Sequence, residues 1–176
     1  HIPVVKKEVA DIEHHMLHFL ENHDEQRIAS PDFAGSAEKG KPAMVVSTTI
    51  STSPTLVYFA QELGEPGAEN AGFGSATRTS IFDYIGVPSL QRWINNKKFD
   101  GGRLSKREKE LRVFYQNLLN FTIQSEALTG AYQEIHYYNK EQNINYDHRI
   151  FSFARWSVKD QLIVVSNFDE SNQYDL

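Results

Sequence analysis

Amide, carboxylate and imidazole side chains follow the apolar run at residues 16–22, which reads MLHFLEN and continues as HDEQR. The run is short and bounded by polar residues, which predicts a buried β-strand. Asn22, His23 and Asp24 then stand at the carboxyl end of that strand. Because ligands of parallel α/β architectures bind at the carboxyl ends of strands, these side chains are candidates for ligand contacts.

A second polar pair, Gln61 and Glu62, follows a second apolar run at residues 55–60, TLVYFA. That run predicts another buried strand, so the pair also lies at a carboxyl end. Carboxylates and amides bind sugar hydroxyls, and a cationic transition state needs a negative charge nearby. The two clusters together predict a sugar or polyol cleft at one rim, although either cluster alone is explained as well by the polar start of a loop.

Four histidines within ten residues, His14, His15, His18 and His23, raise the alternative of a metal site. Along an extended chain, at about 3.3 Å per residue, His14 and His15 lie roughly 30 Å from His23. One ion cannot easily collect ligands so far apart. Solvated or locally hydrogen-bonded histidines are the preferred interpretation, so no metal ligand is predicted, and a metal-dependent hydrolase is kept as an alternative.

The elements around the two clusters follow a strand–helix–strand pattern. A helix is predicted at residues 41–50, between the two apolar runs, and this spacing is typical of a βαβ unit with parallel strands. Farther along, Ser105 and Glu108 have the spacing of a capping box. Apolar residues at helical spacing continue to Thr122 and predict a second, longer helix.

After Gly130 the pattern changes to short or alternating apolar runs, AYQEIHYY, RIFSFARW and QLIVVSNF. These predict three antiparallel strands joined by polar turns. A boundary near residue 125 therefore divides the chain into an α/β portion, residues 1–125, and the start of an antiparallel β domain, residues 126–176.

The segment 61–104 is long and shows no sustained periodicity. Long irregular segments inside compact domains usually carry function or are disordered, and aromatic residues here indicate that packing orders this one. It contains Arg78 and Asp83. We interpret this pair as an ion pair that holds the segment in place, in preference to a direct contact with substrate.

The composition excludes several classes of protein. A net charge of −5 and a pI near 5.8 argue against nucleic acid as a partner, because phosphate contacts need clustered Lys and Arg. No run approaches the roughly 18 apolar residues of a membrane span, so no membrane partner is predicted. The chain has no cysteine, which excludes disulfides, zinc thiolates and cysteine nucleophiles.

Four stretches of the sequence resemble the α-amylase superfamily, glycoside hydrolase family 13. HFLENHDEQR resembles the end of that family's seventh barrel strand, and PTLVYFAQELGE resembles the segment through its eighth strand to a Gln-Glu pair. RTSIFDY and FDGGRLS resemble the loop before the last barrel helix in bacterial α-amylase-like proteins. The resemblance implies an α/β fold: the seventh and eighth βα units of a TIM-type (β/α)8 barrel, followed by the start of an antiparallel β-sandwich C-terminal domain.

The resemblance also implies roles for individual residues. Asp24 matches the family carboxylate that stabilises the oxocarbenium-like transition state, and His23 matches the histidine that binds the sugar at the cleavage subsite. Asn22 has a supporting role, while Gln61 and Glu62 lie at the cleft rim and contact substrate. The implied activity is hydrolysis of α-1,4-glucosidic bonds in starch-like glucans or maltooligosaccharides by a retaining mechanism.

One departure from the family pattern is large. The family's nucleophile and general acid lie upstream of the Asn-His-Asp motif, and only 21 residues precede Asn22 here. We therefore expect a fragment that is inactive alone and needs the missing N-terminal part of the same barrel. Exposed sheet edges would favour self-association of the fragment.

Expectations about cofactors, location and an alternative function complete the sequence analysis. No cofactor is expected in this chain, and calcium is a candidate ligand of the parent protein. A periplasmic or extracellular location is expected by analogy alone. The alternative function is a non-catalytic carbohydrate-binding or interaction protein with a degenerate barrel. The presence of Asp24 and His23 favours the enzyme, because a degenerate site often loses its charged centre.

Overall fold

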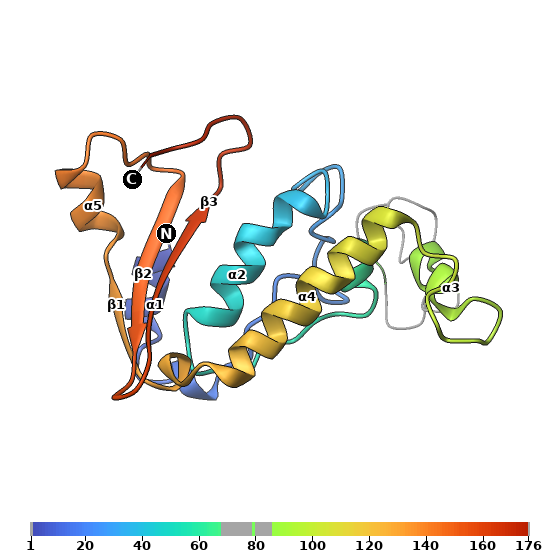
Figure 1. The fold of residues 1–176 in the computed structure, drawn as a ribbon, viewed down its shortest axis with the longest axis horizontal. Helices are drawn as coiled ribbons and strands as arrows, with labels where there is room; N and C mark the ends of the chain where they lie inside the picture. Colours follow the sequence, from blue (N-terminus) through green and yellow to red (C-terminus); the bar gives the residue numbers. More distant parts are fainter. Residues whose placement is uncertain (1, 68–78, 80–85, 176) are drawn as a thin grey trace. The chain divides into compact units, whose positions relative to one another are not determined.

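The structure is a computed structural model that describes residues 2–67, 79 and 86–175. It combines helices with a three-stranded antiparallel sheet (Figure 1). The residues form two compact units. The first unit comprises His1–His18, Pro42–Thr55 and Asn120–Leu176, and the second comprises Phe19–Lys41 and Leu56–Leu119.

The sheet of the first unit confirms the three predicted antiparallel strands. Strand β1 (Ala131–Glu134) pairs with β2 (Ile150–Trp156), which pairs with β3 (Gln161–Asn167), in the order β1-β2-β3. The strands lie side by side in Figure 1. Helix α2 (Lys41–Thr49) confirms the helix predicted at residues 41–50.

The core of the first unit joins helix α2 and its following residue to the sheet. Val46 and Ile50 pack with Phe151, Phe153 and Val164, and all five are buried. Burial of large apolar side chains stabilises such a cluster by about 1.5–3 kcal/mol per residue. Other short helices of this unit are α1 (Ile2–Glu8), η1 (Glu13–His15) and η5 (Glu126–Thr129).

The first predicted strand is shorter than the sequence suggested. It ends at Glu134, and the following residues form helix α5 (His136–Gln142) instead of a continuing strand. The Glu134 carboxylate accepts a hydrogen bond from the Tyr137 amide at 2.8 Å, and the Asn139 amide side chain donates to the Ile135 carbonyl at 2.7 Å. These local side-chain bonds satisfy backbone groups at the helix start and so compete with the sheet ladder.

The two predicted parallel strands are reduced to a single parallel bridge between His18 and Thr55. The His18 amide donates to the Pro54 carbonyl at 2.9 Å. The strand prediction for residues 16–22 and 55–60 is therefore wrong in extent, although the parallel direction is right. A parallel ladder is stable where neighbours bury both faces, and at Ala60 (φ 62°) the backbone already turns into the 3₁₀ helix η3 (Gln61–Leu63).

The second unit has its own core around the short helix α3 (Pro88–Ile94). Ala60, Leu63, Val87 and Leu104 are buried together there.

The predicted boundary at residue 125, between an α/β portion and a β domain, stays a prediction. The two compact units are groups of contacting residues, and they do not correspond to the two predicted domains. A further 3₁₀ helix, η2 (Glu38–Gly40), precedes α2.

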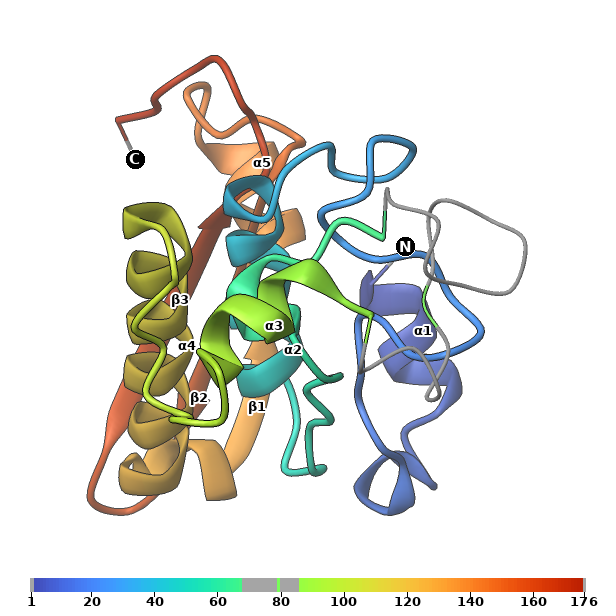
Figure 2. The same ribbon diagram turned by 90° about the vertical axis from the view of Figure 1, so that its right-hand side faces the viewer.

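Helix α4 (Lys106–Gln124) begins as the sequence predicts and is a single long helix in Figure 2. The Ser105 amide donates to the Glu108 carboxylate at 2.7 Å, and the Glu108 amide donates to the Ser105 hydroxyl at 3.3 Å. This reciprocal pair is the capping box, which satisfies two otherwise free backbone donors. None of the described helices is both long enough and apolar enough to cross a membrane.

Candidate functional site

The loop at residues 21–28 presents His23 and Asp24 to solvent on a turn shaped by Asn22. The Asn22 side-chain oxygen accepts hydrogen bonds from the amides of Asp24 at 2.8 Å and Glu25 at 2.9 Å. His23 Nε2 lies 3.2 Å from Asp24 Oδ2, and the two side chains are 55% and 73% exposed. Asn22 therefore supports the turn, while the imidazole and the carboxylate are accessible to a ligand.

A buried ion pair closes the base of this loop. Arg27 Nη1 donates to Glu21 Oε1 at 2.7 Å, and the Ile28 amide donates to Glu21 Oε2 at 2.6 Å. The Arg27 and Glu21 side chains are 0% and 2% exposed. Burial raises the pKa of Glu21, and the charge of Arg27 opposes that rise.

The sequence analysis did not single out Glu21 or Arg27. A signal for them was present, because each charged residue stands directly beside an apolar one, Leu20 or Ile28, at an end of the polar run. An apolar neighbour that packs in the core brings the adjoining charged residue close to the core as well. A charge that is buried there needs a partner of opposite charge or a hydrogen-bonding group.

Arg27 also reaches the segment that carries the second predicted cluster. It donates to the Phe59 carbonyl at 2.8 Å and to the Thr79 hydroxyl, with Nε at 2.8 Å. Its guanidinium carbon lies 4.5 Å from the ring centroid of Tyr58 and 4.7 Å from that of Phe59. A planar guanidinium makes such bonds and ring contacts at once.

Gln61 is directed inward and is only 3% exposed. Its side-chain oxygen accepts a hydrogen bond from the Tyr58 amide at 2.9 Å, and its nitrogen donates to the Tyr115 hydroxyl at 3.2 Å. Burial raises the pKa of Tyr115 above its ordinary range, so the phenol stays protonated. These contacts fit a supporting role for Gln61 inside the second unit.

Glu62 is half-buried and lines an open pocket of about 510 Å³ together with Trp93 and Arg112. Burial raises the pKa of the Glu62 carboxyl, while the charges of Arg112 and Arg27 lower it. The charge of Arg27 therefore lowers the pKa of both Glu21 and Glu62, against the effect of burial.

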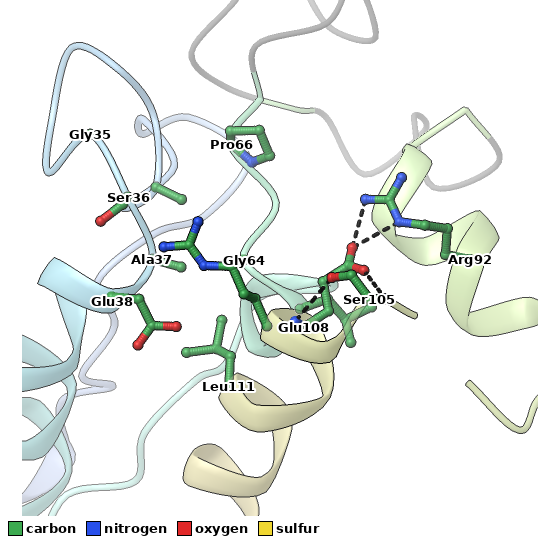
Figure 3. Close-up of a pocket in the computed structure, with 13 residues that line it drawn as sticks. Gly35, Ser36, Ala37, Glu38, Gly64, Pro66, Arg92, Ser105, Glu108 and Leu111 are labelled. Carbon is green, nitrogen blue, oxygen red and sulfur yellow. Dashed lines mark hydrogen bonds and ion pairs between the residues drawn. The ribbon is translucent and has the colours of Figure 1, made fainter. Parts of the chain in front are cut away.

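A second pocket of the same unit, of about 370 Å³, lies beside the start of α4 (Figure 3). Arg92 donates to Glu108 Oε1 from Nε at 2.8 Å and from Nη2 at 2.6 Å, as the dashed lines in Figure 3 mark. Although burial opposes it, the hydrogen bonds from Arg92 and Ser105 hold the pKa of Glu108 below its ordinary value. Glu38, which also lines this pocket, pairs with Lys41. The carboxylates of this pocket are therefore engaged with cations.

The histidine cluster of the sequence does not form a metal site among the described residues. Among the described residues, no three His, Asp or Glu side chains converge as a metal-binding group. The rings of His14 and His15 lie 3.9 Å apart, and burial lowers the pKa of His18. The predicted ion pair of Arg78 and Asp83 lies outside the residues that the structure describes.

Comparison with known proteins finds similarity among solved structures. No family model matches the chain, and no curated protein does. Among solved structures, a mutant of the trehalose-6-phosphate hydrolase TreA from Bacillus licheniformis matches with a TM-score of 0.53 and 15% sequence identity. The fold is similar to part of a glycoside hydrolase. The match covers 96% of this chain and 38% of the TreA chain.

Proposed function

We propose that this chain is part of a retaining glycosidase of the α-amylase type, glycoside hydrolase family 13, that hydrolyses α-1,4-glucosidic bonds of starch-like glucans or maltooligosaccharides. The observation that carries the proposal is the exposed His23–Asp24 pair, held on an Asn22 turn above a buried ion pair. The fold similarity to a glycoside hydrolase supports it.

In this proposal Asp24 supplies negative charge where the sugar ring becomes positive. Hydrolysis with retention passes through oxocarbenium-like transition states, and a fixed carboxylate beside the ring lowers their energy. His23 donates a hydrogen bond to a sugar hydroxyl, and Asn22 fixes the turn that carries both residues. Glu62 contacts substrate at the rim of the cleft, and Gln61 holds the backbone behind it.

The nucleophile and the general acid come from the rest of the parent protein in this proposal. The match to only 38% of the TreA chain supports this division. The α-glucan binds where the missing N-terminal part of the barrel meets this chain. Calcium, if the parent binds it, uses ligands outside this chain, and the chain alone does not turn over glycosides.

The test is starch and maltooligosaccharide hydrolysis by the reading frame extended upstream, compared with its Asp24→Asn variant. We expect activity in the parent and a loss of at least about 10³-fold in kcat for the variant, because one fixed charge at the transition state contributes that much. Glu25→Gln, on the neighbouring exposed residue, is the matched control and retains activity.

Two results would contradict the proposal. An Asp24→Asn variant with undiminished kcat would remove the role of that carboxylate. A folded, inactive parent that still binds maltooligosaccharides in calorimetry would support a carbohydrate-binding protein instead.

A further inference from the structure

We propose that Arg27 is a positioning residue that sets kcat by fixing the loop of Asp24 to the Phe59 carbonyl and the Thr79 hydroxyl. This inference rests on the proposed function. Arg27 itself has no access to substrate, because its side chain is 0% exposed.

The first step is closure of the loop. Glu21 uses both carboxylate oxygens, one for Arg27 and one for the Ile28 amide, so the two ends of residues 21–28 are joined by side-chain bonds. Charge-assisted hydrogen bonds of this kind are short and about twice as strong as neutral ones. Within the closed loop, Asn22 fixes the amide of Asp24.

The second step is the link across the second unit. Arg27 makes four hydrogen bonds, one to Glu21, one to the Phe59 carbonyl and two to the Thr79 hydroxyl. The Tyr58 hydroxyl donates to the Thr79 carbonyl at 3.0 Å, so Thr79 is held from two sides. A lysine has one nitrogen and cannot reach all these acceptors from one position.

The third step concerns which kinetic constant responds. A displacement of a transition-state charge by about 1 Å can cost about 10²-fold in rate. Binding of the ground-state sugar uses many hydroxyl contacts and depends less on that position. Loosening Arg27 therefore lowers kcat and leaves KM nearly constant.

The experiment uses the upstream-extended protein with Arg27→Lys and, as a milder change, Thr79→Val. We expect kcat to fall by about 10²-fold in Arg27→Lys and by about 10-fold in Thr79→Val, with KM within about 3-fold. Arg92→Lys is the matched control, because it changes an Arg–Glu pair of the same unit whose arginine is 44% exposed, and it leaves both constants unchanged.

Hydrogen exchange measured by mass spectrometry gives a second readout that needs no activity. We expect faster exchange in the peptide covering residues 19–28 for Arg27→Lys and Thr79→Val, and unchanged exchange in peptides of helix α4. If the parent has no glycosidase activity, the proposed function fails and the catalytic part of this inference fails with it. Faster exchange would then still establish loop fixation.

Unchanged exchange in both variants would overturn loop fixation, whatever the activity. Faster exchange with an unchanged kcat in an active parent would overturn the link to catalysis. If Arg27→Lys does not fold, Thr79→Val decides, because it removes only the hydroxyl that accepts two of the four bonds.

Discussion

Arg27 and Arg155 are both buried, and their charges have different partners. Arg27 faces the carboxylate of Glu21, whereas Arg155, on strand β2, donates to the backbone carbonyls of Thr49, Leu128 and Gly130. Thr49 ends helix α2, and the carboxyl end of a helix carries partial negative charge that stabilises a cation. Among the described residues, Arg155 Nε has no hydrogen-bond partner. Arg27 therefore bonds to the loop at residues 21–28, whereas Arg155 connects helix α2 to the sheet.

Replacing Arg155 with Met tests the second role. Met fills similar space but leaves three carbonyls without their donor, and each lost bond costs about 1 kcal/mol. We expect the free energy of unfolding to fall by about 2–4 kcal/mol in urea denaturation. Lys159→Met, on an exposed lysine, is the control and changes it by less than about 0.5 kcal/mol. Equal values for the two variants would show that the Arg155 bonds contribute nothing net.

At the scale of elements, the sequence correctly predicted the features that depend on residues close together in the chain. The capping box at Ser105 located the start of α4, and apolar alternation located β2 and β3, since both patterns depend on residues close in sequence. The runs at residues 16–22 and 55–60 gave strand signals without strands, because strand length depends on neighbouring strands, which no single segment encodes.

The candidate site was predictable in part. Asn22, His23 and Asp24 were predicted as a cluster because polar residues follow an apolar run, and the structure places them on one turn. The Glu21–Arg27 pair was missed although Leu20 and Ile28 mark its positions, and the bond from Arg27 to Thr79, 52 residues away, was missed because such contacts have no local pattern. The inward direction of Gln61 was missed for the same reason, since Tyr115 lies 54 residues from it.

Gly130 lies between η5 and β1, where the backbone of β2 at Trp156 approaches it closely. A Cβ at this position would lie 1.9 Å from the Trp156 carbonyl oxygen, which belongs to backbone that cannot move freely. We expect Gly130→Ala to lower the free energy of unfolding by about 1–3 kcal/mol in urea denaturation. Gly102→Ala is the control, because its nearest atom is Nδ2 of the flexible Asn95 side chain. A smaller loss in Gly130→Ala than in Gly102→Ala would contradict this account.

For the whole molecule, ionised carboxylates are stabilised at several places. Hydrogen bonds from Arg149 lower the pKa of Asp147 to about 2, and bonds from Tyr174 and Ser171 hold that of Asp169 well below its ordinary value. The carboxyl of Asp160 also has a lowered pKa, chiefly through its bond from the Ser125 hydroxyl. Burial acts oppositely on Glu21 and Glu62, whose pKa values are raised.

The lowered pKa values of these aspartates predict that acid destabilises the folded chain. A carboxyl whose pKa is lowered by folding contributes stability above its unfolded value of 3.8, and that contribution is lost as the pH falls toward about 2. We expect the melting temperature, followed by circular dichroism, to fall steeply between pH 4 and pH 2.5. Asp169→Asn should flatten this dependence, because its carboxylate lies 2.8 Å from Arg149 Nη2 and accepts the bonds that depend on its charge. Asp175→Asn, which removes the same charge from an exposed residue nearby, should leave the slope unchanged. Equal slopes in the two variants would assign the acid response to other carboxylates.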